Sequence, residues 1–266
     1  MDQEVCYERL RPRQIVAARS ACPIAYLPIG TIEWHGPHNP TGCDTLTAHA
    51  LAVRCARAGG GLVMPPLWYG ESREEGLMEA NAADREQIHA FMELPSAGFA
   101  PGFMRFTPQQ QYETYQRLLL HCLCQLQSLG FRVIVVVAGH YPLLDHARAA
   151  CHLFHQARFD GRRARTITWA FTGHELVADV FPQGGDHAGF WETSIALALF
   201  PELTDLGELP ADPATPAVGT ITTRPIRGAS AEYGERVVAL IVERATAAAR
   251  DRLEHPEKYY PHGLRL

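Results

Sequence analysis

The segment FRVIVVVA at residues 131–138 constrains the fold of this chain most strongly. It is a nearly unbroken run of apolar, β-branched side chains, with Gly130 before it and Gly139 after it. A strand with one solvated face alternates apolar and polar residues, whereas a strand covered on both faces is apolar throughout. The segment therefore predicts a central strand of a parallel sheet that has helices on both faces.

The remaining elements alternate in the same style. Further strands are predicted at residues 23–29, 61–70 and 165–171, and the prolines of the second confine it to a bend or a sheet edge. Helices are predicted at residues 44–61, 80–93, 107–129, 145–158, 192–200 and 231–255, with Thr107-Pro108 as a cap followed by proline. Residues 201–225 read as an extended connection. This order predicts an α/β fold, a three-layer sandwich with a mostly parallel central sheet.

We expect one domain over residues 1–266, with an excursion at residues 71–106. The net charge of −5 offers no attraction to phosphate backbones or anionic lipid, so nucleic acid and membrane are not expected as partners. The N-terminal sequence lacks the apolar core of a signal peptide, and a membrane span would need about 18 apolar residues. The seven scattered cysteines read as free thiols of a reducing compartment. We therefore expect a soluble, cytoplasmic protein.

Polar residues that suit a metal site follow the predicted strands. Glu33, His35 and Asp44 come after the first strand, and His140 comes after the strongest one. Asp186, His187 and Glu192 follow the fourth strand. Because the carboxyl ends of parallel strands meet at one edge of the sheet, these clusters should face a common crevice.

The spacing favours a metal site without proving it. Residues two apart in an extended chain share a face, so Glu33 and His35 should point the same way while Trp34 points back. Carboxylate and imidazole suit a divalent transition metal, and Asp44 has two oxygens with which to bridge two ions. Asp44 also heads a predicted helix, however, and could act as its N-cap.

Four motifs in this order resemble those of the creatininase (creatinine amidohydrolase) family. LPIGTIEWHGPHNPTGCDT is similar to the family signature LP-G-x-x-E-Q-H-G-P-H-L-P-x-x-x-D-T, and VVVAGHY is similar to a strand that ends in N-G-H. GDHAGFWETSIAL and ASAEYGER are similar to the segments H-A-G-x-x-E-T-S and A-S-x-E-x-G. Together these motifs cover residues 27–236.

The resemblance implies a binuclear metal hydrolase of small, often cyclic amides or formamides. Glu33 would bind one ion, His35 the other, Asp44 would bridge them, and His140 would complete a shell. The resemblance also implies two divalent ions per subunit, with zinc first and manganese or iron as alternatives. A metal-bridging hydroxide would attack the amide carbonyl. The expected partner is a small-molecule amide substrate.

The same resemblance assigns catalytic roles to two residues and implies self-association. His187 would pass a proton to the leaving nitrogen, as suits a group that titrates near neutral pH. Glu192 would ligate metal or orient His187, although a carboxylate near a helix N-terminus is also favoured by the helix dipole. The chain would form a homo-oligomer, with a hexamer as one candidate.

Four departures from the family pattern qualify this interpretation. Pro142 stands where creatininase has a ligating glutamate, so creatinine itself is a doubtful substrate, and Trp34 replaces the usual glutamine. The departures at Ala138, Pro142 and Leu143 leave open an inactive family member that acts as an assembly or regulatory subunit. The long excursion carries several aromatic residues, and an active-site lid and a subunit contact are equally good interpretations of it.

Overall fold

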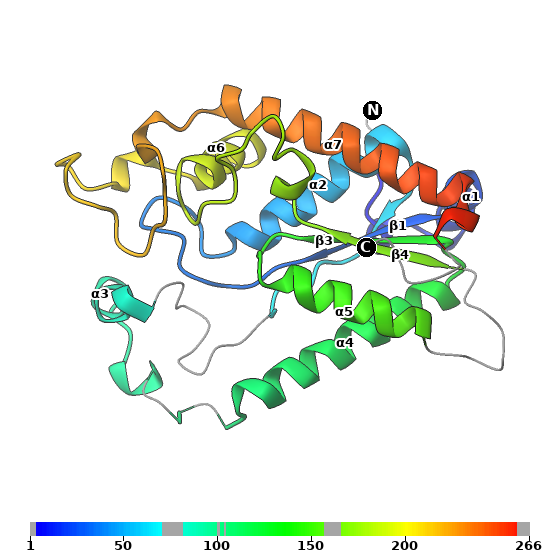
Figure 1. Cartoon of the computed structure of the whole chain (residues 1–266), viewed down its shortest axis with the longest axis horizontal. Coiled ribbons are helices and arrows are strands. Elements are labelled where there is room, and N and C mark those ends of the chain that lie inside the picture. Colours follow the sequence, from blue (N-terminus) through cyan, green and yellow to red (C-terminus); the bar gives the residue numbers. More distant parts are fainter. Residues whose placement is uncertain (1–3, 71–81, 100–101, 104, 157–165, 260–266) are drawn as a thin grey trace.

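The chain forms a four-stranded parallel sheet flanked by helices (Figure 1). The computed structural model describes residues 4–70, 82–99, 102–103, 105–156 and 166–259. The sheet order is β2-β1-β3-β4, and all three neighbouring pairs are parallel. The strands are β1 (Ile24–Ile29), β2 (Leu62–Val63), β3 (Val133–Ala138) and β4 (Ile167–Phe171). β3 lies between β1 and β4, so its predicted central place is confirmed.

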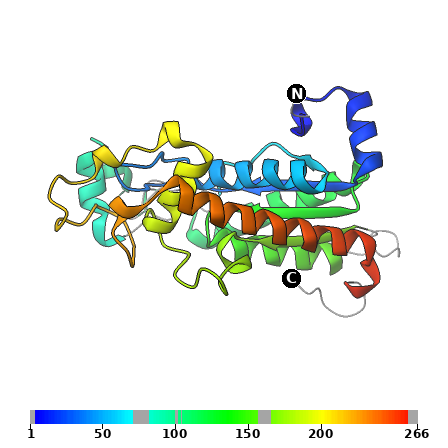
Figure 2. The same cartoon turned by 90° about the horizontal axis from the view of Figure 1, so that it is seen from above.

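Helices cover both faces of this sheet. Figure 1 shows α2, α6 and α7 above the sheet and α4 and α5 below it, and Figure 2 shows the same layers from above. The predicted three-layer α/β sandwich is therefore confirmed. The helices are α1 (Pro12–Ala21), α2 (Cys43–Gly59), α3 (Arg85–Phe91), α4 (Pro108–Ser128), α5 (Leu143–Gln156), α6 (Phe190–Leu199) and α7 (Ala231–Glu254).

The apolar run of β3 explains the two helical layers. Val133, Val135 and Val137 point into the core shared with α2 and α7. Ile134 and Val136 point to the opposite face, into the core shared with α4 and α5. Since successive side chains of a strand alternate between faces, only a strand that is apolar at every position can serve both cores.

Most element boundaries agree with the sequence-based expectations. Thr107 caps α4: its Oγ1 accepts the N–H of Gln110 at 3.3 Å, and the Gln110 side chain accepts the N–H of Thr107 at 3.0 Å. β2 has two residues and lies at the sheet edge, as its prolines predicted. Residues 201–225 contain short 3-10 helices instead of a plain extended connection. The 3-10 helices within this connection are η5 (Pro201–Leu203) and η6 (Leu206–Glu208). Elsewhere the described residues form η1 (Tyr7–Arg9), η2 (Ala82–Asp84), η3 (Ser96–Phe99), η4 (His174–Leu176), η7 (Ile226–Gly228) and η8 (Pro256–Lys258).

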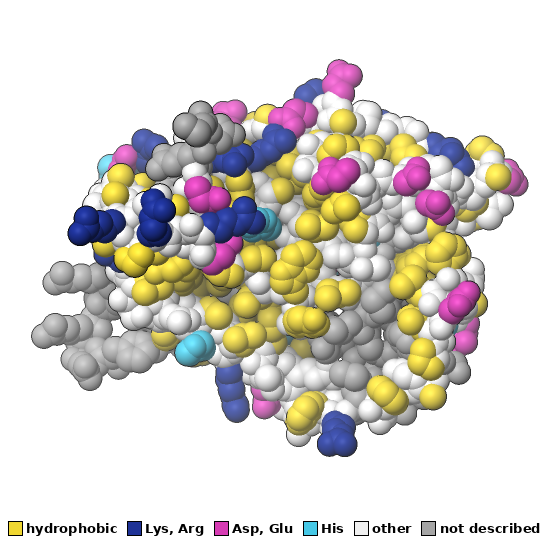
Figure 3. Space-filling view, turned by 180° about the vertical axis from the view of Figure 1, so that it is seen from behind, with side chains coloured by type: hydrophobic (Ala, Val, Ile, Leu, Met, Phe, Trp, Pro, Cys, Tyr) yellow, Lys and Arg dark blue, Asp and Glu magenta, His cyan; other side chains and the backbone are white. Residues whose placement is uncertain are grey.

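The α3 helix of the excursion lies at the end of the molecule where β1 runs into the loop before α2 (Figures 1 and 2). Residues 71–81, 100–101 and 104 of it lie outside the described part of the chain. Its α3 buries Ile88, whereas Phe91, Phe103 and Phe106 are 56–62% exposed. Figure 3 shows many apolar side chains across the face opposite to that of Figure 1. Lid and subunit contact both stay predictions for this segment.

Within the described ranges, no helix combines the length and the apolar content that crossing a membrane requires. All seven cysteines carry free thiols, as expected from their scattered positions. Cys43, beside Asp44, is buried, and burial raises the pKa of its thiol well above the ordinary value. This thiol is therefore protonated near neutral pH and is a poor nucleophile or metal ligand.

Candidate metal centre

A glycine at the end of β3 brings two polar loops together. Gly139 donates its N–H to the carbonyl of Ile29 at 2.9 Å, so the ends of β1 and β3 stay paired. A Cβ on Gly139 would lie 1.9 Å from the carbonyl oxygen of Asp44. Only glycine allows this approach of β3 to the start of α2, and it places His140 directly beside Asp44.

The first ligand group combines the ends of β1 and β3. His140 Nδ1 lies 3.0 Å from Glu33 Oε1 and 3.2 Å from Asp44 Oδ2. All three side chains are buried. One ligand atom from each of them falls within a sphere small enough to hold a single metal ion.

The second ligand group shares Asp44 with the first. His35 Nε2 lies 3.0 Å from Asp44 Oδ1 and 3.9 Å from Glu192 Oε2. These three residues could also hold an ion. The two oxygens of Asp44 therefore face different groups, which is the arrangement that a bridging carboxylate needs. We call the five residues Glu33, His35, Asp44, His140 and Glu192 the cage.

Two backbone carbonyls fix the histidine rings at the cage. His35 Nδ1 donates to the carbonyl of Glu33 at 3.2 Å, which directs Nε2 towards Asp44. His187 Nε2 donates to the carbonyl of Trp34 at 2.9 Å, which leaves Nδ1 3.6 Å from Glu33 Oε1. A second hydrogen bond of this kind sets the tautomer and orientation of a metal-binding or catalytic imidazole. Glu33, His35 and His187 form a further possible ligand group.

The charges of the cage depend strongly on one another. Burial lowers the pKa of His35, but the carboxylates of Asp44, Glu192 and Glu33 outweigh it and raise this pKa to about 10. Burial raises the pKa of Asp44, yet His35 and His140 hold it well below its ordinary value. The protonated imidazole thus compensates the buried carboxylate, a task that a metal cation would also perform.

Glu192 and His187 are shifted mainly by burial. Burial raises the pKa of Glu192 to about 8 against the opposing effect of His35, and the carboxylate of Asp44 adds to the rise. Burial and the nearby His35 lower the pKa of His187. His187 is therefore neutral near pH 7, with its Nδ1 able to accept a proton.

The donor set fits divalent cations. Three carboxylates and two imidazoles converge in a buried space, where Asp44 Oδ2 makes no well-formed hydrogen bond to the described residues. Buried carboxylates are costly unless cations pair with them, and a metal ion in each group would supply that pairing. Mixed nitrogen and carboxylate ligands suit zinc, manganese or iron.

The N-cap interpretation of Asp44 is wrong. The N-cap position of α2 is Gly42, and the Asp44 carboxylate points into the cage instead of back to the helix N-terminus. The glycine- and proline-rich loop before α2 lets the helix begin ahead of Asp44, which frees its side chain from capping.

The predicted bounds began this helix at Glu192, whereas α6 starts at Phe190. Glu192 Oε2 accepts the N–H of Ala188 at 2.6 Å, so this carboxylate serves the helix start and the cage together. Asp186 accepts the N–H groups of Trp191 and Glu192 at 2.9 and 3.1 Å. The side chain of Asp186 therefore caps α6 and does not join the cage.

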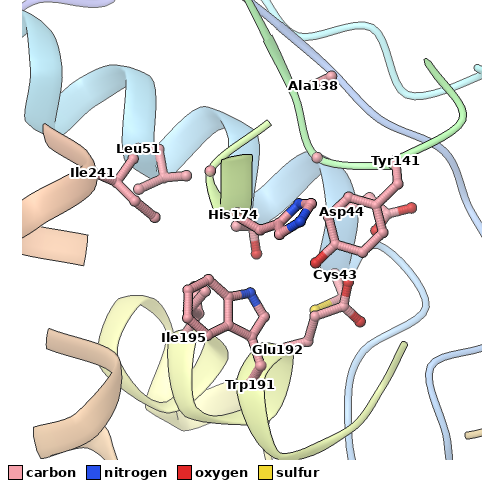
Figure 4. A pocket seen from close by; sticks show the side chains of 13 residues that line it. Cys43, Asp44, Leu51, Ala138, Tyr141, His174, Trp191, Glu192, Ile195 and Ile241 are labelled. Carbon is pink, nitrogen blue, oxygen red and sulfur yellow. The ribbon is translucent and has the colours of Figure 1, made fainter. Parts of the chain in front are cut away.

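A small pocket beside the cage includes residues that sequence reasoning missed. Figure 4 shows Tyr141, His174 and Trp191 around a space next to Asp44 and Glu192. His174 Nδ1 is buried and has no hydrogen-bond partner among the described residues. Tyr141 follows β3 and His174 follows β4, so the rule that sites lie at the carboxyl ends of strands could have found both.

The family model of creatininase, described as creatinine amidohydrolase, matches residues 8–249. The chain belongs to the creatininase family. It is 26% identical over 254 residues to creatinine amidohydrolase of Pseudomonas putida, covering 86% of this chain and 89% of the relative. It is 28% identical over 244 residues to the mycofactocin precursor peptide peptidase of Mycolicibacterium smegmatis, covering 84% and 83%.

Solved structures agree with this family membership. A point mutant of creatininase complexed with creatine superposes with a TM-score of 0.70 at 26% identity, covering 96% of this chain and all of that one. The predicted family and fold are thus confirmed. Membership places the protein among hydrolases that act on amide bonds.

Proposed function

We propose that this protein is a metal-dependent amidohydrolase that uses two divalent ions per subunit to cleave a C–N bond in a small amide, lactam or formamide. The observation that carries the proposal is that the two carboxylate oxygens of Asp44 face different histidines. One oxygen lies 3.0 Å from His35 Nε2, and the other lies 3.2 Å from His140 Nδ1. A carboxylate so placed can bridge two ions.

We assign Glu33, Asp44 and His140 to one ion and His35, Asp44 and Glu192 to the other. Bound ions would supply a water of lowered pKa and would stabilise negative charge on the carbonyl oxygen. Pro142, which replaces a ligating glutamate of creatininase, is exposed and lies outside the cage. Glu192 takes over the third ligand position in this assignment, so the loss of that glutamate leaves the second ion with three ligands.

His187 is the proton carrier of the proposal. Its Nδ1 faces the cage and its Nε2–H is held by the Trp34 carbonyl. The neutral ring accepts a proton at Nδ1 as water attacks the carbonyl carbon. The same nitrogen then delivers that proton to the leaving nitrogen, so that an amine departs and not an unstable amide anion.

Zinc is our first choice of metal, with manganese or iron as alternatives. Solved creatininases are described as a Zn-Zn type and as a Mn form, and the nitrogen and carboxylate donors of the cage suit both metals. The pocket of Tyr141, His174 and Trp191 is our candidate for the substrate side of the centre.

The test combines elemental analysis with a substrate panel. The purified protein, stripped with a chelator and reloaded separately with Zn²⁺ or Mn²⁺, is assayed against lactams, formamides and short peptide amides. We expect about two ions per chain and metal-dependent release of an amine or ammonia that His187→Ala abolishes. Fewer than about one ion per chain, with Asp44→Ala unchanged in activity, would refute the proposal.

The alternative of an inactive family member rests on Ala138, Pro142 and Leu143. It predicts no hydrolysis of any amide in the panel by the fully loaded protein. Because these three residues do not contribute a side chain to the cage, their departures do not by themselves remove a ligand that our assignment uses.

A further inference from the structure

The Trp34 side chain joins the excursion to the metal-binding loop. Trp34 lies between Glu33 and His35, but its indole points away from the cage and is 2% exposed. Its Nε1–H donates to the carbonyl of Val218 at 2.8 Å. Its ring meets Phe91 of α3 edge to face, with centroids 5.1 Å apart and an interplanar angle of 69°.

The segment around Gly219 completes this junction. Gly219 has a φ of +66°, and a Cβ there would lie 2.5 Å from Trp34 Cδ1 and 3.2 Å from Ile88 Cδ1. Its N–H donates to Asp84 Oδ2 of the excursion at 3.1 Å. Glycine is therefore required both by its backbone conformation and by the close packing of α3 against the indole.

The same two segments hold His187. The carbonyl of Trp34 accepts the ring Nε2–H of His187 at 2.9 Å. The backbone of His187 exchanges two hydrogen bonds with Ile221, at 2.9 and 2.8 Å. The ring and the backbone of His187 are thus both anchored to segments that the excursion contacts, one at Trp34 and the other at Gly219.

We infer that α3 braces the proton carrier: through Trp34 and Gly219 the excursion fixes the orientation of the His187 ring, which makes Trp34, Phe91 and Asp84 positioning residues. The inference rests on the proposed role of His187. It gives the described part of the excursion a function that neither a lid nor a subunit contact requires, because these contacts lie on the far side of Trp34 from the cage.

The brace predicts a specific change in the kinetics of the enzyme. A displacement of a catalytic group by about 1 Å can lower the rate roughly 100-fold without changing substrate binding. Loosening α3 should therefore reduce kcat and leave KM and metal content nearly unchanged. A residue that merely stabilised the fold would instead lower the amount of folded protein and leave the kinetics of the folded fraction intact.

The test uses Phe91→Ala and Asp84→Ala, with Phe106→Ala and Glu86→Ala as matched controls from exposed positions of the same excursion. Trp34→Phe removes the bond to Val218 but keeps a ring against Phe91. On the fastest amide of the panel we expect kcat to fall about tenfold in Phe91→Ala and Asp84→Ala, with KM within about twofold and metal content unchanged. The controls should match the wild type.

A second measurement does not depend on activity. In the Zn²⁺-loaded protein labelled with ¹⁵N-histidine, long-range ¹H–¹⁵N spectra report the tautomer of each imidazole, and His187→Gln assigns the His187 signal. We expect the pure Nε2–H form in the wild type and both controls, and an averaged signal in Phe91→Ala and Asp84→Ala.

Three outcomes would overturn the brace: an unchanged His187 signal and kcat in both variants, equal losses in Phe106→Ala, or a loss of metal that parallels the loss of kcat. Failure of the proposed function has a different appearance. In that case the loaded wild type hydrolyses no amide, while the His187 spectra still decide whether α3 orients the ring.

Discussion

The two ligand groups of the cage differ in how the fold builds them. Glu33 and His140 follow adjacent paired strands, and their closest atoms lie 3.0 Å apart. In the other group, Glu192 comes from α6, outside the sheet, and lies 3.9 Å from His35. The Glu192 side chain is 12% exposed, compared with 3% for Glu33. A group built on paired strands is more rigid, so we expect the Glu33 group to bind its ion more tightly.

The largest effect on metal binding and activity should follow from substituting Asp44, the residue that the two ligand groups share. Asp44→Asn leaves one oxygen and no charge, so both sites weaken together. We expect both ions to be lost on dialysis and kcat/KM to fall about 10³-fold or more, equivalent to roughly 4 kcal/mol of transition-state stabilisation. Elemental analysis and amide hydrolysis measure the two losses. Retention of both ions would contradict the bridging role.

The comparison becomes sharper when each group is damaged separately. Glu192→Gln should lose only the weaker ion, retain about one ion per chain after dialysis, and bind the second ion roughly 100-fold less tightly. Glu33→Gln should lose the tighter ion. Titration with Zn²⁺ after chelation measures both affinities, and Glu202→Gln, at an exposed position just beyond α6, is the control. Equal losses in the two variants would show that the groups are not independent.

The pH dependence of metal binding should also separate the groups. In the metal-free protein His35 has a pKa of about 10 and Glu192 a pKa of about 8, so both hold protons at pH 7. An ion can bind only after these protons leave. Affinity at the His35 group should therefore rise as pH increases, by up to about two powers of ten per pH unit below pH 8, with a smaller slope between 8 and 10.

Calorimetry in buffers of different ionisation enthalpy counts the protons released. About two protons per ion at the His35 group near pH 7 would agree with the charges described above. No proton release, or an affinity that falls with rising pH in this range, would mean that His35 and Glu192 are already deprotonated in the metal-free protein.

The smallest effect is expected at the position where the family glutamate is missing. Pro142 is exposed, so the side chain of Pro142→Glu should stay in solvent. We expect metal content and kcat to change less than about twofold, since a surface substitution away from special features usually costs at most about 0.5 kcal/mol. If Pro142→Glu instead restored the second ion in a Glu192→Gln background, the loop could rearrange and Glu192 would not be the necessary ligand.

Local sequence signals predicted much of the fold and part of the cage. The Thr107 cap, the apolar run of β3 and the helical periodicity of α7 depend on residues that are close together in the sequence. Their patterns were therefore sufficient to predict these elements. Glu33, His35, Asp44 and His140 could be found because each lies in the loop after a strand or at the start of the following helix. The interpretation of Asp44 as an N-cap failed because the start of α2 depends on turns that the pattern did not fix.

The sequence placed Glu192 at the common crevice but left its role open between a metal ligand, a support for His187 and a helix-start carboxylate. It likewise left the excursion open between a lid and a subunit contact. The distance of Glu192 from His35 depends on how α6 packs, and no local pattern encodes the packing of distant elements. The contact of Phe91 with Trp34 likewise joins segments that are far apart in the sequence. His174 and Tyr141 lie at strand ends, but their rings meet only once the sheet has formed.

The sequence by itself determined a parallel sheet between two helical layers, with ligand-type side chains at the carboxyl ends of its strands, because side-chain periodicity and chain direction fix those features locally. Only the tertiary structure decided which oxygen of Asp44 faces which histidine, which carboxylate completes the second group, and what holds His187. Those choices depend on differences of about 1 Å between packed elements, a precision that only the complete, close-packed core imposes.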